Sequence, residues 1–288
     1  MGSCALTLAD AVSRGEHAEP LAAFRRGGTP LVQCEGICKS FGPVHALTDV
    51  DFELYAGEVV ALVGDNGAGK STLIKAISGV QPADSGVIRF EGKKVEIRSA
   101  SDATRLGIET VYQDLALCDN LDTVANLFLG RELTEPPLRR LLHVLSEPSM
   151  ESRTSARLHD LGVTTINSLR RPVATLSGGQ RQSVAVARAT LWEAKVVILD
   201  EPTAALGVTQ TAQVLELIRH LREQGLGVVV ISHNIDVVFG VADRIVVLYV
   251  GRHIATFDRA TTTREEVVGA IVGLAPGTAT AARDRRAG

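Results

Sequence analysis

The sequence predicts an α/β fold: a mostly parallel β-sheet core, an antiparallel β region at its edge, and an inserted helical subdomain. Short runs that are apolar on both faces recur along the chain, as expected of parallel strands covered by helices on both sides. Segments with helical periodicity separate these runs, and such alternation is typical of a parallel sheet. Residues 115–175 interrupt the alternation with helix-like pieces and no buried strand, which predicts the inserted subdomain.

Composition limits how many cores the chain can form, and it indicates the partners and the compartment to expect. With 288 residues and 45% hydrophobic content, the chain can form one substantial core with an insertion. The formal net charge of −3 does not indicate a basic surface, so we expect no nucleic-acid partner. Cys34 and Cys38 lack a second cysteine or histidine pair, so we expect no metal site there, and scattered thiols are typical of a reducing compartment.

Neither end of the chain has the pattern of a membrane segment. The apolar run at residues 267–277 is shorter than the roughly 20 residues that a helical span needs. The first twenty residues lack a basic start followed by an apolar core, so no secretory signal is predicted. We therefore expect a cytoplasmic chain, to which another polypeptide would supply any membrane part.

The first elements come in the following order. Residues 1–30 show no clear periodicity and are predicted to be a loosely ordered extension. Residues 49–54 alternate between hydrophobic and acidic residues, which predicts a strand with one face in water. Residues 59–64 are apolar on both faces, which predicts a strand buried between helices.

Further strands and a helix complete the expected sheet. Three more apolar runs predict strands at residues 196–200, 228–232 and 245–249. Residues 211–225 predict a helix, because hydrophobic residues recur at helical spacing and Gly225 supplies a stop. We expect residues 31–274 to form one domain, followed by a disordered basic tail at residues 275–288.

A glycine-rich loop follows the apolar run 59–64 and precedes a predicted amphipathic helix. It matches the pattern G-x-x-x-x-G-K-[ST] in the strand–loop–helix setting that the pattern requires. Its residues are Gly64, Asp65, Asn66, Gly67, Ala68, Gly69, Lys70, Ser71 and Thr72. Glycines let successive backbone N–H groups form an anion-binding nest, to which the helix N-terminus adds partial positive charge. The alternative, a turn that binds nothing, is disfavoured by the Lys-Ser pair.

We therefore expect a P-loop NTPase, with the loop holding the phosphates of a nucleotide. Lys70 is expected to reach the outer phosphates, and the hydroxyl of Ser71 is a candidate ligand for Mg²⁺. The run 196–200 ends in Asp200, a second candidate for holding Mg²⁺, and is followed by Glu201, which is free to polarise an attacking water. Alone, this acidic pair could be an ordinary strand end; beside the loop, it predicts a catalytic pair.

The segment LSGGQRQSVAVARA, residues 176–189, begins a second helix with a glycine-rich N-terminus. Its first residues are Ser177, Gly178, Gly179 and Gln180. Bare amides there would form a second anion site, which the same nucleotide reaches only if another subunit brings it. With this segment, residues 31–255 resemble the ATP-binding-cassette (ABC) ATPases. The resemblance implies a head-to-tail dimer in which the signature segment of one subunit closes over ATP bound to the other.

The resemblance also implies roles for single residues. Phe41 would stack on adenine, although a core aromatic is the alternative. Gln113 would touch Mg²⁺ and link the sheet to the helical subdomain, and His233 would contact the γ-phosphate, both as catalytic residues beside Glu201. One position departs from the family: Gly207 stands where the family usually has an aspartate in the loop crossing the dimer interface, so coupling between the sites is expected to use other groups.

Two sequence segments, residues 112–133 and 201–208, resemble those of the ATPases of bacterial monosaccharide importers of the ribose, xylose and fructose kind. The resemblance implies an ATP-hydrolysing subunit that pairs with a second copy of itself. It also implies a separate membrane permease, contacted through the helical subdomain near Gln113, and indirectly an extracytoplasmic sugar-binding protein. The chain would then lie on the cytoplasmic face of the membrane, and no residue in it specifies the sugar.

Three alternatives differ from this interpretation. The chain could serve an importer of another substrate class, or be a soluble ABC ATPase of repair or translation. The latter usually carry two cassettes or a long coiled-coil insertion, for which 288 residues leave no room. A regulatory cassette that binds ATP without hydrolysis is disfavoured by Lys70, Glu201 and His233.

Overall fold

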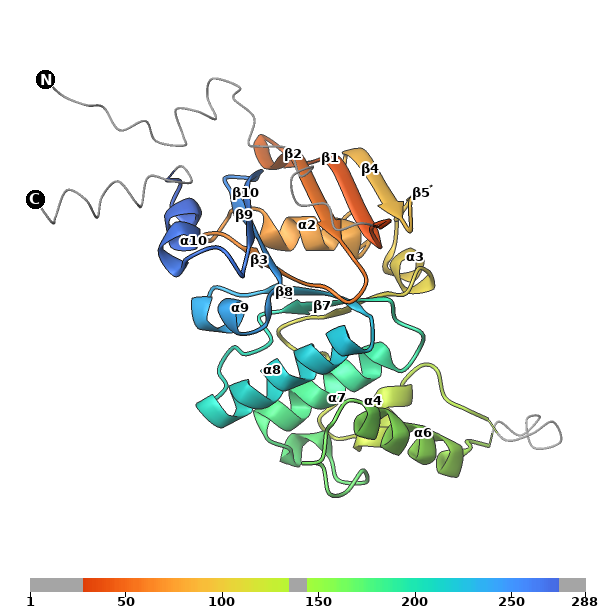
Figure 1. Ribbon diagram of the computed structural model, residues 1–288. Helices are drawn as coiled ribbons and strands as arrows, with labels where there is room; N and C mark the ends of the chain where they lie inside the picture. Colours follow the sequence, from red (N-terminus) through yellow and green to blue (C-terminus); the bar gives the residue numbers. More distant parts are fainter. Residues whose placement is uncertain (1–27, 135–143, 275–288) are drawn as a thin grey trace, which may run out of the picture.

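The computed structural model describes residues 28–134 and 144–274, which form two β-sheets and the helices around them (Figure 1). The extension predicted at residues 1–30 lies outside the described residues up to residue 27, and the basic tail predicted at residues 275–288 lies outside them entirely. The fold class predicted from the sequence is confirmed, and the two sheets differ in direction as expected.

The smaller sheet is antiparallel. Its strand order is β2-β1-β4-β5, with bounds β1 Val32–Phe41, β2 Val44–Leu54, β4 Ser85–Phe90 and β5 Lys93–Val95. The alternating strand predicted at residues 49–54 is the end of β2, but its acidic face is not uniformly wet. Glu53 is only 4% exposed and accepts hydrogen bonds from the Tyr55 hydroxyl (3.1 Å) and from Gln33 Nε2 (3.3 Å). These partners make its burial tolerable, and local alternation could not reveal them.

The larger sheet carries the predicted buried strands. Its order is β10-β9-β3-β8-β7-β6, with bounds β3 Val59–Val63, β6 Ile108–Val111, β7 Val196–Asp200, β8 Gly227–Ile231, β9 Arg244–Tyr249 and β10 Arg252–Asp258. Strands β9, β3, β8, β7 and β6 run parallel, and β10 is antiparallel to β9. Sequence reasoning missed β6 and β10 because β6 has only four residues, two of them polar, and β10 mixes charged and apolar residues.

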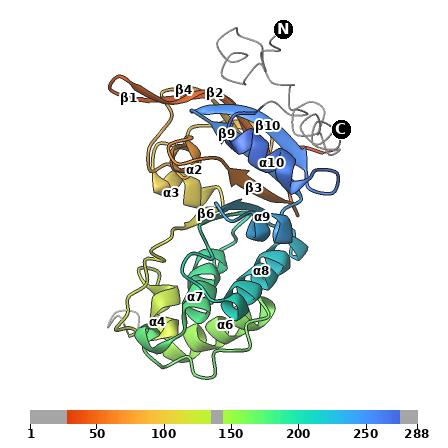
Figure 2. The ribbon, with the colours of Figure 1, turned by 90° about the vertical axis from the view of Figure 1, so that its left-hand side faces the viewer.

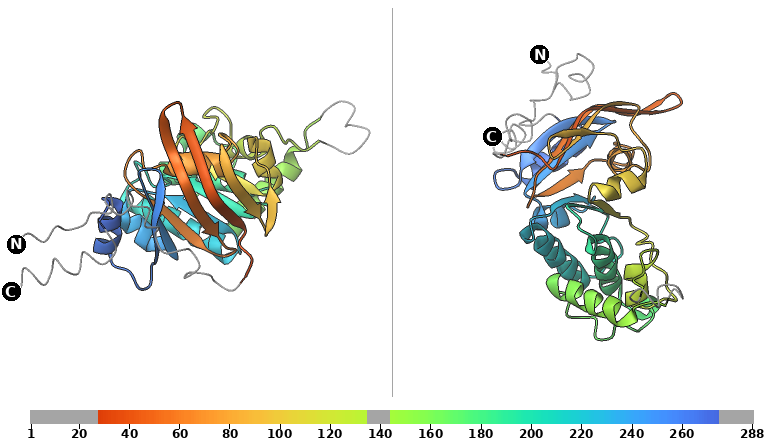
Figure 3. Two further views of the ribbon diagram at one scale, coloured as in Figure 1. Left: turned by 90° about the horizontal axis from the view of Figure 1, so that it is seen from above. Right: turned by 90° about the vertical axis from the view of Figure 1, so that its right-hand side faces the viewer.

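Helices cover both faces of this sheet (Figures 1 and 2). Along β8, Val229 and Ile231 pack in a cluster with α2, whereas Val228 and Val230 pack in a cluster with α7 and α8. The bounds are α2 Lys70–Ile77, α3 Ala100–Arg105, α7 Gly178–Thr190, α8 Val208–Glu223, α9 Ile235–Val241 and α10 Arg264–Ile271. Because successive strand residues face opposite ways, α2 and α7 lie on opposite sides of the sheet. Seen from above, the antiparallel sheet covers the α2 side (Figure 3).

Where it is described, the chain between β6 and α7 consists of helices joined by loops. It contains α4 Thr123–Phe128, the short 3-10 helix η2 Val173–Thr175 and α6 Glu147–Asp160. These helices gather with α7 at the end of the molecule far from the antiparallel sheet (Figure 2). None of the helices within residues 28–134 and 144–274 has both the length and the apolar character needed to cross a membrane.

A buried ion pair lies between β9 and the loop that connects β2 with β3. The guanidinium Nε of Arg244 on β9 lies 3.5 Å from Glu58 Oε1, with side chains only 4% and 1% exposed. Arg244 also donates to the backbone oxygen of Glu53, and the second carboxylate oxygen of Glu58 accepts from the Tyr55 amide at 3.0 Å. Removing one charge would leave the other buried without its counter-ion, which is more destabilising than replacing both.

We predict that Arg244→Met lowers the free energy of unfolding by about 3–5 kcal/mol, because the Glu58 carboxylate then lies buried without its cation. Urea unfolding followed by circular dichroism measures the change. The control is Arg98→Met, whose 2.6 Å ion pair with Glu96 is exposed and should contribute less than about 1 kcal/mol. Equal effects of the two substitutions would contradict a structural role for the buried pair.

Candidate active site

The carboxyl ends of the parallel strands bring the predicted site residues to one edge of the sheet. The phosphate-binding loop follows β3, Gln113 stands two residues after β6, Asp200 ends β7, and His233 stands two residues after β8. Parallel pairing of β3 with β8, β8 with β7 and β7 with β6 aligns these ends. Ligands of open α/β sheets bind at this edge.

The loop after β3 lies so close to its neighbours that two of its positions need glycine. A β-carbon on Gly64, where φ is +151°, would lie 2.3 Å from the carbonyl oxygen of Leu248. A β-carbon on Gly69, where φ is +100°, would lie 2.7 Å from the carbonyl oxygen of Ala46. Glycine is therefore required at these two positions for two reasons: the backbone has a positive φ, and a side chain would clash with β9 or β2.

Lys70 folds back over this loop. Its Nζ donates hydrogen bonds to the carbonyl oxygens of Gly64 (2.8 Å) and Asp65 (2.9 Å). Burial lowers the pKa of the amine, and the negative charges of Glu201, Asp65 and Asp200 oppose this by raising it. The side chain thus places a cation inside the loop and beside the acidic residues at the end of β7.

The two acidic residues at the end of β7 have different surroundings. Burial raises the pKa of the Asp200 carboxyl, the charge of Glu201 raises it further, and Lys70 lowers it. Glu201 has a left-handed backbone with φ of +48°, which is uncommon for a residue with a side chain. Its amide donates to the carbonyl oxygen of Ile231 at 3.0 Å, so a bond to β8 holds this conformation.

His233 is hydrogen-bonded to Glu201 through both its backbone and its ring. Glu201 Oε1 accepts from the His233 amide at 3.2 Å and lies 2.8 Å from His233 Nδ1. An ionised carboxylate only accepts, so Nδ1 carries the proton and Nε2 is the free ring nitrogen. The His233 side chain is 77% exposed, so this second nitrogen is accessible to a ligand.

The remaining predicted ligands are accessible as well. Ser71 and Gln113 are exposed, and together with Asp200 they offer hydroxyl, amide and carboxylate oxygens, the ligand types that Mg²⁺ prefers. Phe41, at the end of β1, is 44% exposed and lies under Lys39, whose Nζ is 5.8 Å from the ring centroid. The aromatic is therefore not part of the core, and the alternative assignment to a core aromatic is wrong.

The signature segment lies apart from the phosphate-binding loop of the same chain. Ser177 caps α7, which is on the opposite face of the sheet from α2. The expectation of bare amides is partly wrong, because a capping box forms: Gln180 N donates to Ser177 Oγ at 3.3 Å, and Ser177 N donates to Gln180 Oε1 at 2.9 Å. Gly207 is the N-cap residue of α8, and its amide donates to Gln210 Oε1 at 3.4 Å.

Sequence reasoning missed one side chain that contacts the segment following Gln113. Arg188 of α7 donates to the carbonyl oxygens of Leu115 and Ala116. The signal was present in the sequence, because a single charged residue in the apolar run VAVARA requires a polar partner when its neighbours are buried.

A strand–loop–helix cradle for phosphate at the carboxyl edge of a parallel sheet defines the P-loop nucleotide-binding proteins. The comparison with known families is more specific. Residues 47–204 match the family model described as ABC transporter, and the chain belongs to this family of ATPases.

The relatives include sugar importers. The fructose import ATP-binding protein FrcA of Rhizobium meliloti is 48% identical over 85% of this chain and 94% of its own length. The xylose/arabinose import ATP-binding protein XylG of Sulfolobus acidocaldarius is 47% identical over 86% of this chain and 96% of its own length.

Solved cassettes share the fold. The ADP conformation of MJ1267, an ATP-binding cassette of an ABC transporter, is 27% identical with a TM-score of 0.69, over 84% of this chain and 95% of that one. A dimeric post-hydrolysis state of the cassette MJ0796, bound to ADP and Pi, is 25% identical with a TM-score of 0.65, over 79% of this chain and 98% of that one.

We predict that Lys70→Ala weakens ATP binding by about tenfold or more, because a charge-assisted contact with phosphate is lost. Isothermal titration calorimetry with ATP measures the dissociation constant. Lys94→Ala, which removes an exposed lysine from β5, is the control and should change the constant less than about twofold. Wild-type affinity in Lys70→Ala would contradict the assignment of the loop to phosphate.

Proposed function

We propose that this chain hydrolyses ATP to power the import of a monosaccharide through a separate membrane permease. The observation that carries the proposal is the meeting of Lys70 with the Glu201–His233 hydrogen bond at one edge of the sheet. This arrangement combines phosphate binding with a carboxylate held in place beside it. The named activities of the fructose and xylose/arabinose relatives support the substrate class.

Each residue at the carboxyl edge of the larger sheet would have its own role in ATP hydrolysis. Residues 64–72 would hold the phosphates, and Phe41 would stack on adenine. Glu201 would polarise the attacking water, with His233 Nδ1 fixing the orientation of the carboxylate. His233 Nε2 would then be free to contact the γ-phosphate.

Magnesium would be held by Ser71, Gln113 and Asp200. The bound ion would neutralise charge that develops on the phosphates during transfer. Asp200 suits this role, because a cation would offset the burial and the neighbouring charge that raise its pKa.

A second copy of the chain would complete each site. Ser177, Gly178, Gly179 and Gln180 would act on ATP held by the partner, since α7 and α2 cover opposite faces of the sheet in one copy. The dimeric state of the cassette MJ0796 with ADP and Pi supports this arrangement. With Gly207 in the interface loop, coupling between the two sites would use groups other than the usual aspartate.

The permease would bind at the helical subdomain near Gln113. A cavity of about 180 Å³ lies between β6, α4 and α7, and its lining includes Glu109, Leu127, Arg131 and Trp192. Mixed aromatic and charged lining of this kind suits a segment of another protein. The chain would lie on the cytoplasmic face of the membrane, and the permease would receive its sugar from an extracytoplasmic binding protein.

We predict that Glu201→Gln retains ATP binding, lowers turnover by about a hundredfold or more, and accumulates a dimer when ATP is present. Phosphate release measures turnover, and size-exclusion chromatography with and without ATP measures the dimer. Glu223→Gln, an exposed substitution near the end of α8, is the control and should leave both unchanged. Undiminished hydrolysis in Glu201→Gln would remove this residue from its proposed role.

The partner is tested with the same variant. Purified from its native host in mild detergent with ATP, tagged Glu201→Gln should bring with it a multi-span permease, identified by mass spectrometry, together with a sugar-binding protein. Recovery of ribosomal or nucleic-acid-binding proteins in place of a permease would contradict import while leaving ATP hydrolysis in place.

A further inference from the structure

The segment that follows Gln113 contains a strained turn. Leu115 and Ala116 both have left-handed backbones, with φ of +59° and +46°. Residues with a β-carbon rarely adopt this conformation, and two in succession require support from their surroundings. Ala116 is exposed, so packing of its own side chain does not supply that support.

Leu115 packs against the cluster around α7, and its amide donates to the Tyr112 carbonyl oxygen at 2.9 Å. Arg188 of α7 adds the side-chain bonds that hold the carbonyl groups of both turn residues. Its Nη1 donates to the carbonyl oxygen of Ala116 at 2.6 Å, and its Nη2 donates to that of Leu115 at 3.1 Å. The planar guanidinium presents two donors in a fixed geometry and so can hold two successive carbonyl groups at once. Arg188 therefore contacts both peptide groups of the strained turn.

The segment immediately beyond the turn is held by other groups. Asn126, fully buried, accepts from the Cys118 amide at 2.8 Å and donates to the Cys118 carbonyl oxygen at 3.0 Å. Asp119 pairs with Arg181 of α7 at 2.6 Å and accepts from the Ala174 amide at 3.0 Å. This part of the segment is thus attached to the helical subdomain without Arg188.

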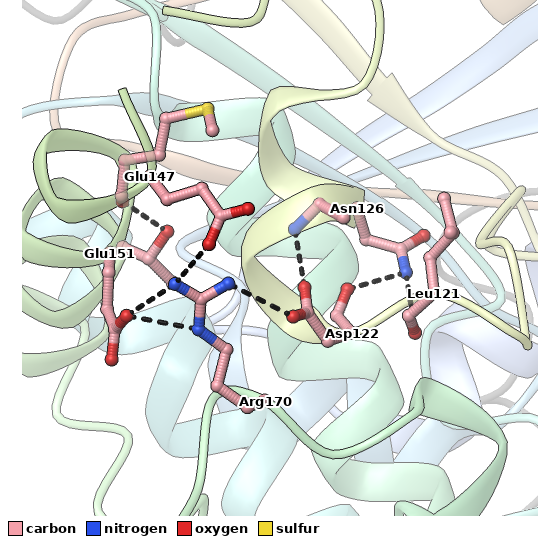
Figure 4. A network of polar contacts seen from close by, with 9 residues as sticks. Leu121, Asp122, Asn126, Glu147, Glu151 and Arg170 are labelled. Atoms are coloured by element: carbon pink, nitrogen blue, oxygen red, sulfur yellow. Dashed lines mark hydrogen bonds and ion pairs between the residues drawn. The ribbon is translucent and has the colours of Figure 1, made fainter. Parts of the chain in front are cut away.

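A third anchor lies at the end of the segment (Figure 4). Arg170 forms ion pairs with Asp122 (3.5 Å), Glu147 (3.2 Å) and Glu151 (2.7 Å), which brings the loop before α7 against α4 and α6. Asp122 in turn caps α4 by accepting from the Ala125 amide at 2.7 Å.

On the other side of Gln113 the chain is tied to the helix of the phosphate-binding loop. The Tyr112 hydroxyl lies 3.3 Å from Ser78 Oγ, at the end of α2. Gln113 therefore stands between a contact to α2 and a turn that is attached to α7. The contact that fixes the turn therefore also fixes the position of Gln113 between α2 and α7.

We propose that Arg188 is a positioning residue that holds the Leu115–Ala116 turn and thereby sets the place of Gln113 relative to the phosphate-binding loop. This inference rests on the proposed role of Gln113 in hydrolysis. Without the two bonds from Arg188, the turn relaxes toward ordinary backbone angles and Gln113 moves with it. Turnover is then lost while ATP is still bound, because the phosphate-binding loop is unchanged.

The test compares steady-state ATP hydrolysis by the purified full chain and its variants in the presence of Mg²⁺. Arg188→Met should lower kcat by about tenfold with KM for ATP within about twofold, because an interaction made in the transition state is lost. Arg219→Met on α8 is the matched control: Arg219 also donates to a backbone carbonyl, that of Gly240 at 3.0 Å, but far from the turn in sequence, and kcat should stay unchanged.

Two substitutions in the turn separate positioning from general stability. Adding Ala116→Gly to Arg188→Met should restore much of kcat, because glycine adopts the left-handed conformation without support. Ala116→Val alone should reproduce the loss, since a β-branched residue resists this conformation and the exposed site leaves the core intact. Wild-type kcat in Ala116→Val, or no recovery on adding Ala116→Gly, would overturn the proposal.

Gln113→Ala distinguishes this inference from the function on which it rests. Suppose that kcat falls in Gln113→Ala but stays normal in both Arg188→Met and Ala116→Val. This result would refute the positioning role of Arg188 and leave the proposed function unchanged. Normal kcat in Gln113→Ala would refute the role of Gln113 itself, and with it the inference.

Discussion

The parallel pairing of β6, β7, β8 and β3 is the constraint on which the rest of the structure depends. Parallel strands end at the same edge, so pairing of neighbouring strands brings together groups that are separated by long stretches of sequence. The phosphate-binding loop, the acidic pair after β7 and the histidine after β8 all owe their proximity to this pairing. The helices on both faces hold the strands in register by burying their alternate side chains.

Left-handed backbone at residues with a side chain also occurs at this edge. Glu201, Leu115 and Ala116 are left-handed although each carries a side chain. In each case a hydrogen bond with another element accompanies the strain: the Glu201 amide donates to the Ile231 carbonyl oxygen of β8, and Arg188 donates to the carbonyl oxygens of the turn. Strain of this kind persists only where the surroundings determine the conformation.

The sheet also separates the two glycine-rich helix starts. Lys70 begins a helix on one face, and Ser177 caps a helix on the other. No rearrangement of side chains can bring them together in one chain, because the sheet lies between them. The segment around Gln113 connects β6 with α4, and Arg188 attaches it to α7.

The sequence by itself determined the nature of the sheet, the phosphate-binding loop and the identity of the acidic pair, because each depends on a local pattern of burial or glycine spacing. Through family resemblance it also predicted roles for Gln113, His233 and the signature residues, and these roles stay predictions. Only the tertiary structure decided the burial of Glu53, the exposure of Phe41 and the bonds of Arg188, whereas the capping box of α7 is a local pattern that the sequence already contained. Arg188 and its partners lie 72 and 73 residues apart, so a charged residue in an apolar run shows that a polar partner is needed but not which group supplies it.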